Sequence, residues 1–271
     1  MIGRRRERGP ERPDTNDLGA MFRWCLASGL DARPQYVWGS LLAAHTAAAL
    51  GRAGFTAIEF GVAGGNGLLA LERAAAAAGE LLGVTAEVHG FDTGTGMPAP
   101  VDHRDVPWVI SPGLFELDEP RLRARLTSAE LVLGPVAETV PEWLSDERAP
   151  IGFAAFDLDY YSATVDAFAV FDAPPERLLP RVVCYFDDVF GLGWSDFAGE
   201  RAAIADFNAA HERRKIGKIH GLRYGLPESQ QRLPWHEQMY LAHLFDHPDY
   251  SRRVVEVPEA WLDAHRLGRD R

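Results

Sequence analysis

Cysteine and long apolar runs are scarce in this 271-residue sequence. The two cysteines, Cys25 and Cys184, provide neither a disulfide framework nor a CxxC metal-binding pattern. No apolar stretch approaches the roughly 20 residues that a membrane-spanning helix needs. The basic residues 4–6 are followed by proline and acidic residues, and not by the apolar segment of a signal peptide. These absences predict a cytoplasmic protein with no membrane partner.

Positive charge is also limited. The sequence has 28 basic and 39 acidic residues, which gives a net charge of −11, and its only lysines are Lys215 and Lys218. No stretch rich in lysine and arginine follows the N-terminus, whereas a nucleic-acid-binding surface needs one. We therefore expect a small molecule as the partner and no nucleic acid.

The composition predicts a polar arm followed by one folded domain. Residues 1–16 are rich in Arg, Glu, Pro and Gly, and we expect them to form a flexible N-terminal arm. Residues 17–271 are expected to form a single domain. Within it, the helical spacing of apolar residues over 17–50 predicts two helices ahead of a core that spans 55–271. These helices would either cover the ligand site or form a contact in a homo-oligomer.

Strand-like apolar runs alternate with helical segments through the core. We expect strands at 56–60, 85–91, 130–133, 151–156, 182–186, 219–224 and 239–245. We expect helices at 68–78, 120–126, 164–171 and 199–213. This alternation predicts an α/β fold with a Rossmann-like, doubly wound and mostly parallel sheet. Because no clear helix separates the last two strands, the final strand is expected to be antiparallel. The loop over 92–119 is long enough to predict a functional lid.

A glycine-rich loop follows the first expected strand. It places Gly61, Gly64 and Gly65 after Glu59, and Asp92 ends the second expected strand. Glycines let a backbone approach a ligand closely, and the helix that follows favours negative groups at its N-terminus. One interpretation is a dinucleotide site in which Asp92 binds the ribose. Another is a tight turn that binds nothing. Glu59 would repel a pyrophosphate but suits an ammonium and a sulfonium, which favours S-adenosylmethionine.

Two aspartate sites close consecutive apolar runs. Asp157 and Asp159 follow one expected strand, and Asp187 and Asp188 follow the next. Because the carboxyl ends of parallel strands meet at the ligand-binding edge of such a sheet, these side chains are expected to converge on one ion. Oxygen ligands favour Mg²⁺, Mn²⁺ or Ca²⁺ over zinc. The alternative is that these aspartates are separate helix caps and loop acids.

The order of these motifs resembles class I S-adenosylmethionine-dependent methyltransferases, and in particular the metal-dependent O-methyltransferases. Residues 157–164, Asp-Leu-Asp-Tyr-Tyr-Ser-Ala-Thr, are similar to the Asp-Gly-Asp-x-Tyr-x-Ser-Thr segment of the macrocin O-methyltransferase family, which methylates sugar hydroxyls in natural products. Residues 131–141 and 186–189 resemble segments of catechol-type O-methyltransferases. The resemblance runs from about residue 58 to residue 189 and is weak in the C-terminal third.

The resemblance implies roles for the matching residues. Glu59 and Gly61, with Gly64 and Gly65 of the same loop, would hold the methionine end of the cofactor, and Asp92 would accept from its ribose hydroxyls. The residues near the adenine would be Gly134, Val136 and Ala137. The metal ligands would be Asp157, Asp187 and Asp188, and the role of Asp159 stays open.

The chain departs from the catechol-type pattern at the expected base. Those enzymes carry a lysine three residues after the first metal aspartate, and this chain has Tyr160 there. The deprotonating group would then be an aspartate of the cluster, Asp157 or Asp188, or a histidine of the C-terminal part. The histidine candidates are His220 and His236.

The C-terminal third contains further candidates for binding an acceptor. The segment 235–240 combines aromatic and polar side chains, as acceptor pockets do. Arg223 would suit a nucleotide-sugar phosphate, because a guanidinium matches phosphate geometry.

The motifs together predict an S-adenosylmethionine-dependent O-methyltransferase, assisted by Mg²⁺ or Mn²⁺, that methylates a hydroxyl of a small natural product. The resemblance favours a sugar, carried as a nucleotide sugar or a glycoside. One alternative is a glycosyltransferase, because Asp157-Leu158-Asp159 also has the DxD spacing that holds a metal and a nucleotide sugar. Another is a scaffold that keeps the fold without catalysis.

Overall fold

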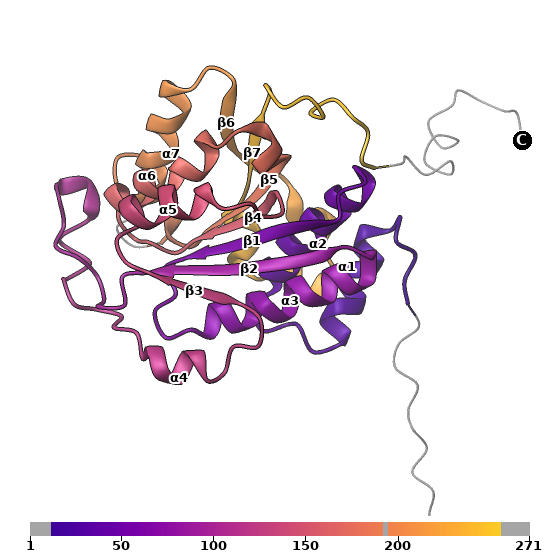
Figure 1. Ribbon diagram of the computed structural model, residues 1–271, viewed down its shortest axis with the longest axis horizontal. Helices are drawn as coiled ribbons and strands as arrows, with labels where there is room; N and C mark the ends of the chain where they lie inside the picture. Colours follow the sequence, from indigo (N-terminus) through magenta and orange to yellow (C-terminus); the bar gives the residue numbers. More distant parts are fainter. Residues whose placement is uncertain (1–11, 192–194, 256–271) are drawn as a thin grey trace, which may run out of the picture.

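The computed structural model describes residues 12–191 and 195–255, which form one mixed β-sheet with helices on both faces (Figure 1). The first eleven residues of the expected N-terminal arm lie outside the described residues. Two helices precede the sheet as predicted, α1 (Leu18–Ala27) and α2 (Pro34–Ala49). The α/β architecture is therefore confirmed.

The sheet has seven strands in the order β3-β2-β1-β4-β5-β7-β6. The strands are β1 (Gly54–Phe60), β2 (Thr85–Asp92), β3 (Glu130–Leu133), β4 (Ile151–Phe156), β5 (Leu178–Phe186), β6 (Arg214–Lys218) and β7 (Met239–Leu244). Strands β1 to β5 pair in parallel, whereas β7 runs antiparallel to both β5 and β6. The prediction of a mostly parallel sheet with an antiparallel final strand is confirmed.

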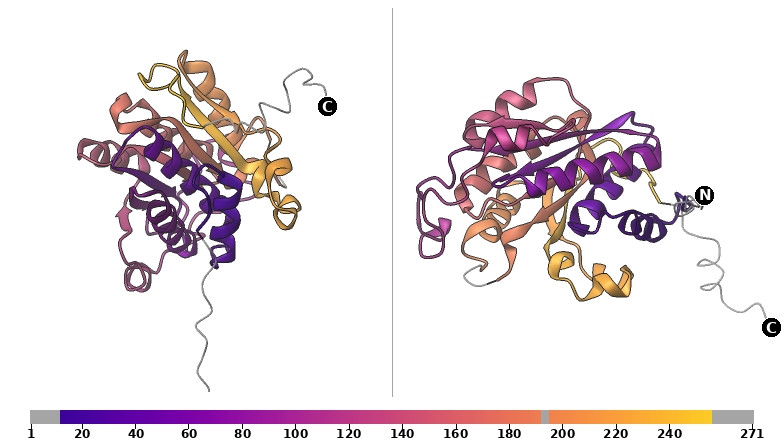
Figure 2. Two further views of the ribbon diagram at one scale, coloured as in Figure 1. Left: turned by 90° about the vertical axis from the view of Figure 1, so that its right-hand side faces the viewer. Right: turned by 90° about the horizontal axis from the view of Figure 1, so that it is seen from below.

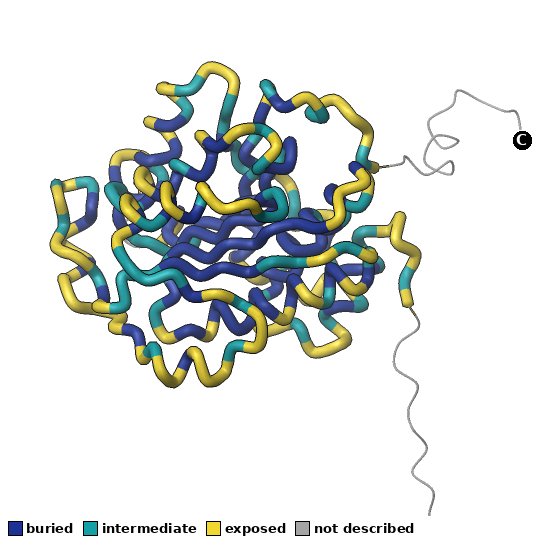
Figure 3. The backbone as a smooth tube through the Cα atoms, in the orientation of Figure 1, coloured by how far each residue is buried: buried dark blue, intermediate teal, exposed yellow. Residues whose placement is uncertain are grey.

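The carboxyl ends of three adjacent strands are level with one another. Phe60 of β1 is in register with Phe156 of β4, which in turn is in register with Phe186 of β5. Their rings stack across the sheet, with centroids 5.2 Å apart for Phe60 and Phe156 and 4.7 Å apart for Phe156 and Phe186. Figure 3 shows these strands as the most buried part of the molecule. The residues that follow the three phenylalanines are therefore brought together at one edge.

Helices from the first part of the chain cover one face of the sheet, and later helices cover the other. One face carries α1, α2 and α3 (Asn66–Leu82), and the other carries α5 (Val136–Ser145), α6 (Tyr161–Ala167) and α7 (Gly199–Ala210). Two short helices, α4 (Glu119–Arg123) and α8 (Glu228–Gln231), lie in connections. Helix α5 was not predicted, because Pro141 within it interrupts the helical pattern. The predicted helix over 164–171 instead begins at Tyr161 and continues as a 3-10 helix over Phe168–Asp172.

The predicted strand over 219–224 is wrong. The strand in this region is β6, and residues Leu222–Gly225 form a 3-10 turn. Strand β6 lies at the edge of the sheet and buries only Ile216 completely, and its half-buried lysines and arginine hide the apolar strand pattern.

The segment between β6 and β7 packs against the N-terminal helices. Trp235 lies next to Phe22 of α1, with ring centroids 5.9 Å apart, and Phe22 also contacts Trp38 of α2. In Figure 2 this gold segment lies beside the indigo helices α1 and α2. The N-terminal helices and the segment that precedes β7 therefore meet next to the carboxyl end of β5.

Among the residues that the structure describes, no helix combines the length and apolar character that crossing a membrane requires.

Candidate functional site

Three aspartates converge at the carboxyl edge of the sheet. Asp157 follows β4, and Asp187 and Asp188 follow β5. One carboxylate oxygen from each lies within 4.8 Å of the others, which is close enough for all three to bind one ion. The predicted cluster is thus assembled, because β4 and β5 are neighbours and end in register.

Burial and mutual repulsion act on these acids. Burial and the charge of Asp187 raise the pKa of Asp157 to about 7. Burial and the charges of Asp159, Asp157 and Asp187 raise the pKa of Asp188 to about 9. Three carboxylates this close cannot all be charged without a compensating cation. The arrangement therefore favours a bound cation over a free triad.

The donor set suits a hard divalent ion. All three groups are carboxylates, and no histidine or cysteine joins them within the part of the chain that the structure describes. Oxygen donors of this kind are the preferred ligands of Mg²⁺ and Mn²⁺. The residues present therefore fit the metal that the resemblance implies.

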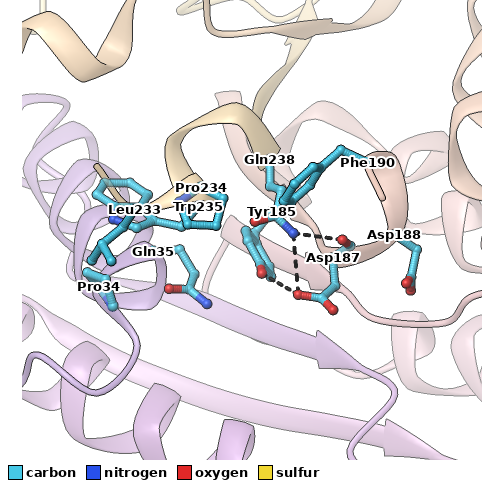
Figure 4. A pocket seen from close by; sticks show the side chains of 10 residues that line it. All are labelled: Pro34, Gln35, Tyr185, Asp187, Asp188, Phe190, Leu233, Pro234, Trp235 and Gln238. Carbon is cyan, nitrogen blue, oxygen red and sulfur yellow. Dashed lines mark hydrogen bonds between the residues drawn. The ribbon is translucent and has the colours of Figure 1, made fainter. Parts of the chain in front are cut away.

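Asp187 is held in place by two neighbours. The Tyr185 hydroxyl donates to Asp187 Oδ1, and Gln238 Nε2 donates to the Asp187 carbonyl oxygen at 2.7 Å (Figure 4). Burial, followed by the charge of Asp187, raises the Tyr185 pKa far above its ordinary value, so this hydroxyl remains a donor. Because Tyr185 lies within β5 and Gln238 directly precedes β7, the antiparallel pairing of these strands brings both to the site.

Asp188 is held by hydrogen bonds to its carboxylate and from its main-chain amide. The main-chain amide of Asp159 donates to Asp188 Oδ2 at 3.1 Å, and the Asp188 amide donates to Glu200 Oε2 at 2.9 Å. Asp159 adopts a left-handed conformation with φ of 58°, which directs its amide toward Asp188. A non-glycine residue rarely adopts this conformation, and such strain is frequent at functional sites.

Glu200 was missed by the sequence analysis. It lies in the first turn of α7, is completely buried, and has no partner for Oε1 among the described residues. Burial and the charge of Asp188 raise its pKa well above the ordinary value. No sequence pattern marks it, because a glutamate at a helix N-terminus is common on protein surfaces.

The glycine loop folds around Asp92. Asp92 Oδ2 accepts from the amides of Val62 and Ala63, both at 2.9 Å, and Asp92 Oδ1 accepts from the amide of Gly94 at 2.7 Å. Its carboxylate thus shapes the loop in addition to facing the cavity next to it. Gly61 has φ of 84°, and a Cβ there would overlap the carbonyl oxygen of Asp157. Only glycine lets β1 and β4 end this close together.

Glu59 lies beneath the loop. It is 1% exposed, and its Oε1 accepts from the Tyr36 hydroxyl of α2 at 2.5 Å. A Cβ on Gly67 would overlap this carboxyl group, so that glycine makes room for it. Burial raises the Glu59 pKa to about 8, although the hydrogen bond from Tyr36 acts to lower it. Its Oε2 is buried and has no partner in the described part of the protein.

A cavity of about 610 Å³ lies over the glycine loop. Its lining includes residues of the loop, the end of β2, the start of α5 and both aspartate sites. Of the predicted site residues, it brings together Gly61, Asp92, Val136, Asp157, Asp159, Asp187 and Asp188. The predicted cofactor residues that do not line it are Glu59, Gly64, Gly65, Gly134 and Ala137. Gly64 and Ala137 are exposed, and a Cβ on Gly65 would overlap Leu122 of α4.

The loop between β2 and α4 covers this cavity and is fastened to α6. The fully buried Asp105 accepts from the Val101 amide at 2.7 Å and from the Ser162 amide and hydroxyl at 2.8 and 2.9 Å. Tyr160, at the position of the catechol-type lysine, donates its hydroxyl to the Pro98 carbonyl oxygen at 3.3 Å. Tyr160 therefore anchors the loop.

A second cavity, of about 510 Å³, lies on the other side of Asp187 and Asp188. It is lined by Pro34, Gln35, Tyr185, Asp187, Asp188, Phe190, Leu233, Pro234, Trp235 and Gln238. Figure 4 shows apolar side chains at one end and the aspartates at the other. Asp187 and Asp188 belong to both cavities, so the cluster lies between them.

The predicted histidines lie outside both cavities. His220 is exposed beyond β6. His236 is buried, with Nε2 3.3 Å from the Gln231 carbonyl oxygen and Nδ1 3.2 Å from Glu237. Neither is brought to the aspartates in the way that a base for an acceptor bound there requires.

Comparison with known proteins finds no matching protein-family model and no matching curated protein. Solved structures do match. The calicheamicin methyltransferase CalS11 is 24% identical, with a TM-score of 0.48, over 64% of this chain and 70% of its own. The O-methyltransferase NovP is 13% identical, with a TM-score of 0.48, over 65% of this chain and 72% of its own. An O-methyltransferase from Bacillus cereus in complex with SAH is 17% identical, with a TM-score of 0.39, over 75% of this chain and 83% of its own.

These structures are described as methyltransferases, the class that the sequence motifs resemble. Because the TM-scores do not exceed 0.48, the functional conclusion depends on the geometry of the site.

Proposed function

We propose that this protein is an S-adenosylmethionine-dependent O-methyltransferase that uses Mg²⁺ or Mn²⁺ to methylate a hydroxyl of a small natural product, with a sugar as the favoured acceptor. The observation that carries this proposal is the aspartate cluster on the lining of a cavity built over the glycine loop. A cofactor in that cavity would lie beside an ion that also reaches the second cavity.

The larger cavity suits the cofactor. Gly61 and Ala63 line it, Asp92 would accept from ribose hydroxyls there, and Val136 would offer an apolar contact to a base. The unpaired Oε2 of Glu59 lies below the same loop, where a positively charged methionine end would be attracted. When bound, the cofactor supplies an electrophilic methyl group.

The aspartate cluster suits the activation of a hydroxyl. A sugar hydroxyl is mostly protonated at neutral pH, and a divalent ion supplies a lowered pKa and a fixed position for such an oxygen. Asp157, Asp187 and Asp188 would hold that ion, so their carboxylates are engaged as ligands. Asp159 lines the larger cavity outside the triad, and we assign to it the acceptance of the acceptor proton.

Ligand binding by the purified protein tests the proposal against the glycosyltransferase alternative. Saturable binding of S-adenosylhomocysteine, together with methyl transfer that stops when a chelator is added and resumes with Mg²⁺, is the expected result. Binding of uridine or thymidine diphosphate without binding of S-adenosylhomocysteine would favour the glycosyltransferase. Intact cofactor binding without turnover on any glycoside or nucleotide sugar would favour the scaffold.

A further inference from the structure

The second cavity has two chemically different ends. Pro34, Leu233, Pro234 and Trp235 form one end, and Asp187 with its neighbours forms the other (Figure 4). Leu233 is 40% exposed, although it is a large apolar side chain. The cavity therefore offers an apolar contact surface at one end and an oxygen-rich one at the other.

The middle of the cavity presents an amide without an internal partner. Gln35 is 8% exposed, and its side chain makes no hydrogen bond to the described residues. Its amide atoms are not completely buried, so water in the cavity can pair with them until a ligand takes its place. Gln35 is therefore positioned to donate to, and accept from, a hydroxylated ligand. The neighbouring Gln238 differs, because its Nε2 already donates to Asp187.

Cationic groups are missing from this lining. The ten described residues that line the cavity include no lysine, arginine or histidine, but they include two aspartates. Arg33 and Arg232 flank lining residues in sequence without lining the cavity themselves, although the charge of Arg33 acts on the lining residue Tyr185. Arg223, the sequence candidate for a phosphate, is exposed and lies over the Tyr224 ring at 5.5 Å. A diphosphate placed here would find no arginine fork and no lysine among the described lining residues.

We propose that this cavity is the acceptor site and that it takes a neutral glycoside, in which a hydroxylated sugar ring is joined to an apolar group, in preference to a nucleotide sugar. The sugar hydroxyl reaches the Asp187 end, Gln35 binds a second hydroxyl, and the apolar group lies against Leu233 and Pro234. This inference rests on the proposed function, because it assigns the cofactor to the other side of the aspartates.

The test compares ligands that share a sugar and differ in what carries it. The pairs are 4-nitrophenyl glucoside with uridine diphosphate-glucose, and 4-nitrophenyl rhamnoside with thymidine diphosphate-rhamnose. Binding to the wild-type protein is measured by calorimetry with Mg²⁺ and S-adenosylhomocysteine present. We expect saturable binding of at least one aryl glycoside and weaker binding of its nucleotide partner.

Two variants locate the binding. Leu233→Arg introduces charge at the apolar end and is expected to weaken binding of the aryl glycoside at least about tenfold, because its apolar contact is lost. Gln35→Leu keeps the side-chain size and is expected to weaken it about threefold to tenfold, the effect of one hydrogen bond. Both variants are expected to bind S-adenosylhomocysteine as the wild type does.

Leu114→Arg is the matched control. Leu114 is 41% exposed, close to the 40% of Leu233, but it lines neither cavity. The same substitution there is expected to leave glycoside affinity unchanged. Equal melting temperatures and cofactor affinities for the three variants exclude misfolding as the cause of weaker binding.

Three outcomes would overturn the inference. These are tighter binding of the nucleotide sugar than of the aryl glycoside, no binding of either aryl glycoside, and equal binding by wild-type and Leu233→Arg protein. Each can occur while S-adenosylhomocysteine still binds, and then the proposed function stands. Failure of S-adenosylhomocysteine to bind the wild-type protein contradicts the proposed function itself, and the acceptor role with it.

Discussion

Glu72 and Asp188 are both almost completely buried, with exposed fractions of 7% and 8%, yet their pKa values shift in opposite directions. Burial raises the pKa of Glu72, but hydrogen bonds from the amides of Ser128, Ala129 and Thr127 outweigh it and lower the pKa overall. For Asp188, burial acts together with the charges of neighbouring aspartates, and the pKa rises. A buried acid that accepts from three amides is stabilised as a carboxylate, whereas one that faces other acids is disfavoured in its charged form.

The two regions also differ in the hydrogen bonds that their acidic side chains accept. Glu72 Oε1 joins α3 to the turn before β3, accepting from Thr127 N at 2.9 Å and Ala129 N at 2.7 Å. In the other region, Asp188 and Glu200 each accept from a single main-chain amide, and Glu200 Oε1 has no partner in the described part of the chain. Substitution should therefore impair stability in the first region and activity in the second.

The largest effect is expected for Asp187→Asn. The amide keeps the shape of the side chain and its contacts with Tyr185 and Gln238, but it weakens the ion site. We expect turnover to fall at least about a hundredfold with cofactor affinity nearly unchanged. Steady-state kinetics and calorimetry with S-adenosylhomocysteine measure the two quantities. Wild-type turnover in this variant would remove the ion from the mechanism.

The second effect concerns stability in the other region. Glu72→Ala leaves three amides of residues 127–129 without their acceptor, and we expect the free energy of unfolding to fall by about 2 to 3 kcal/mol. Urea denaturation measures this change. Glu72→Gln, which keeps an acceptor oxygen, is the control and should lose less. An unchanged free energy of unfolding for Glu72→Ala would erase the distinction between the regions.

When no divalent cation is present, we expect Asp188→Asn to raise the free energy of unfolding, whereas Glu72→Ala lowers it. A raised folded pKa means that the stability contributed by the neutral acid is present below the unfolded pKa and is lost as pH rises toward about 9. The variant avoids this loss, so we expect it to exceed the wild type by about 1 to 2 kcal/mol at pH 8 and to match it near pH 4. Thermal melts across pH measure the difference. With Mg²⁺ added at pH 8, the wild type should gain stability and the variant should not.

The smallest effect is expected for an acid that is not buried. Glu119 pairs with Arg123 at 2.6 Å on α4, with side chains 42% and 50% exposed. Glu119→Gln should change the free energy of unfolding by less than about 0.5 kcal/mol, because exposed ion pairs contribute little. Urea denaturation with and without 0.5 M salt, roughly enough to screen such a pair, checks this value. A larger change would show that burial is not what separates the regions.

The aspartate cluster was predictable because its cause is local. Each acid directly follows an apolar strand, and adjacent parallel strands end at the same edge. The glycine loop was predictable for the same reason, since Gly61 and Asp92 both follow strands. The order of strand ends along the chain thus indicates which side chains meet.

The supporting residues were not predictable, because tertiary contacts bring them to the site. Glu200 comes from a helix on one face of the sheet, and Gln238 comes from the segment before an antiparallel strand. The charged edge strand β6 shows the same limit, since solvent exposure removes the apolar pattern that identifies a strand. The functions of His220 and His236 stay predictions that the geometry does not favour.

Asp159 has two separate roles: its main-chain amide holds Asp188 through a hydrogen bond, and its side chain is the proposed proton acceptor. Because the donor is a main-chain amide, a residue that also tolerates φ of 58°, such as asparagine or glycine, would keep this hydrogen bond without the carboxylate. The proton-accepting group proposed at position 159 is therefore open to exchange within that small set of residues, while the position of Asp188 is retained.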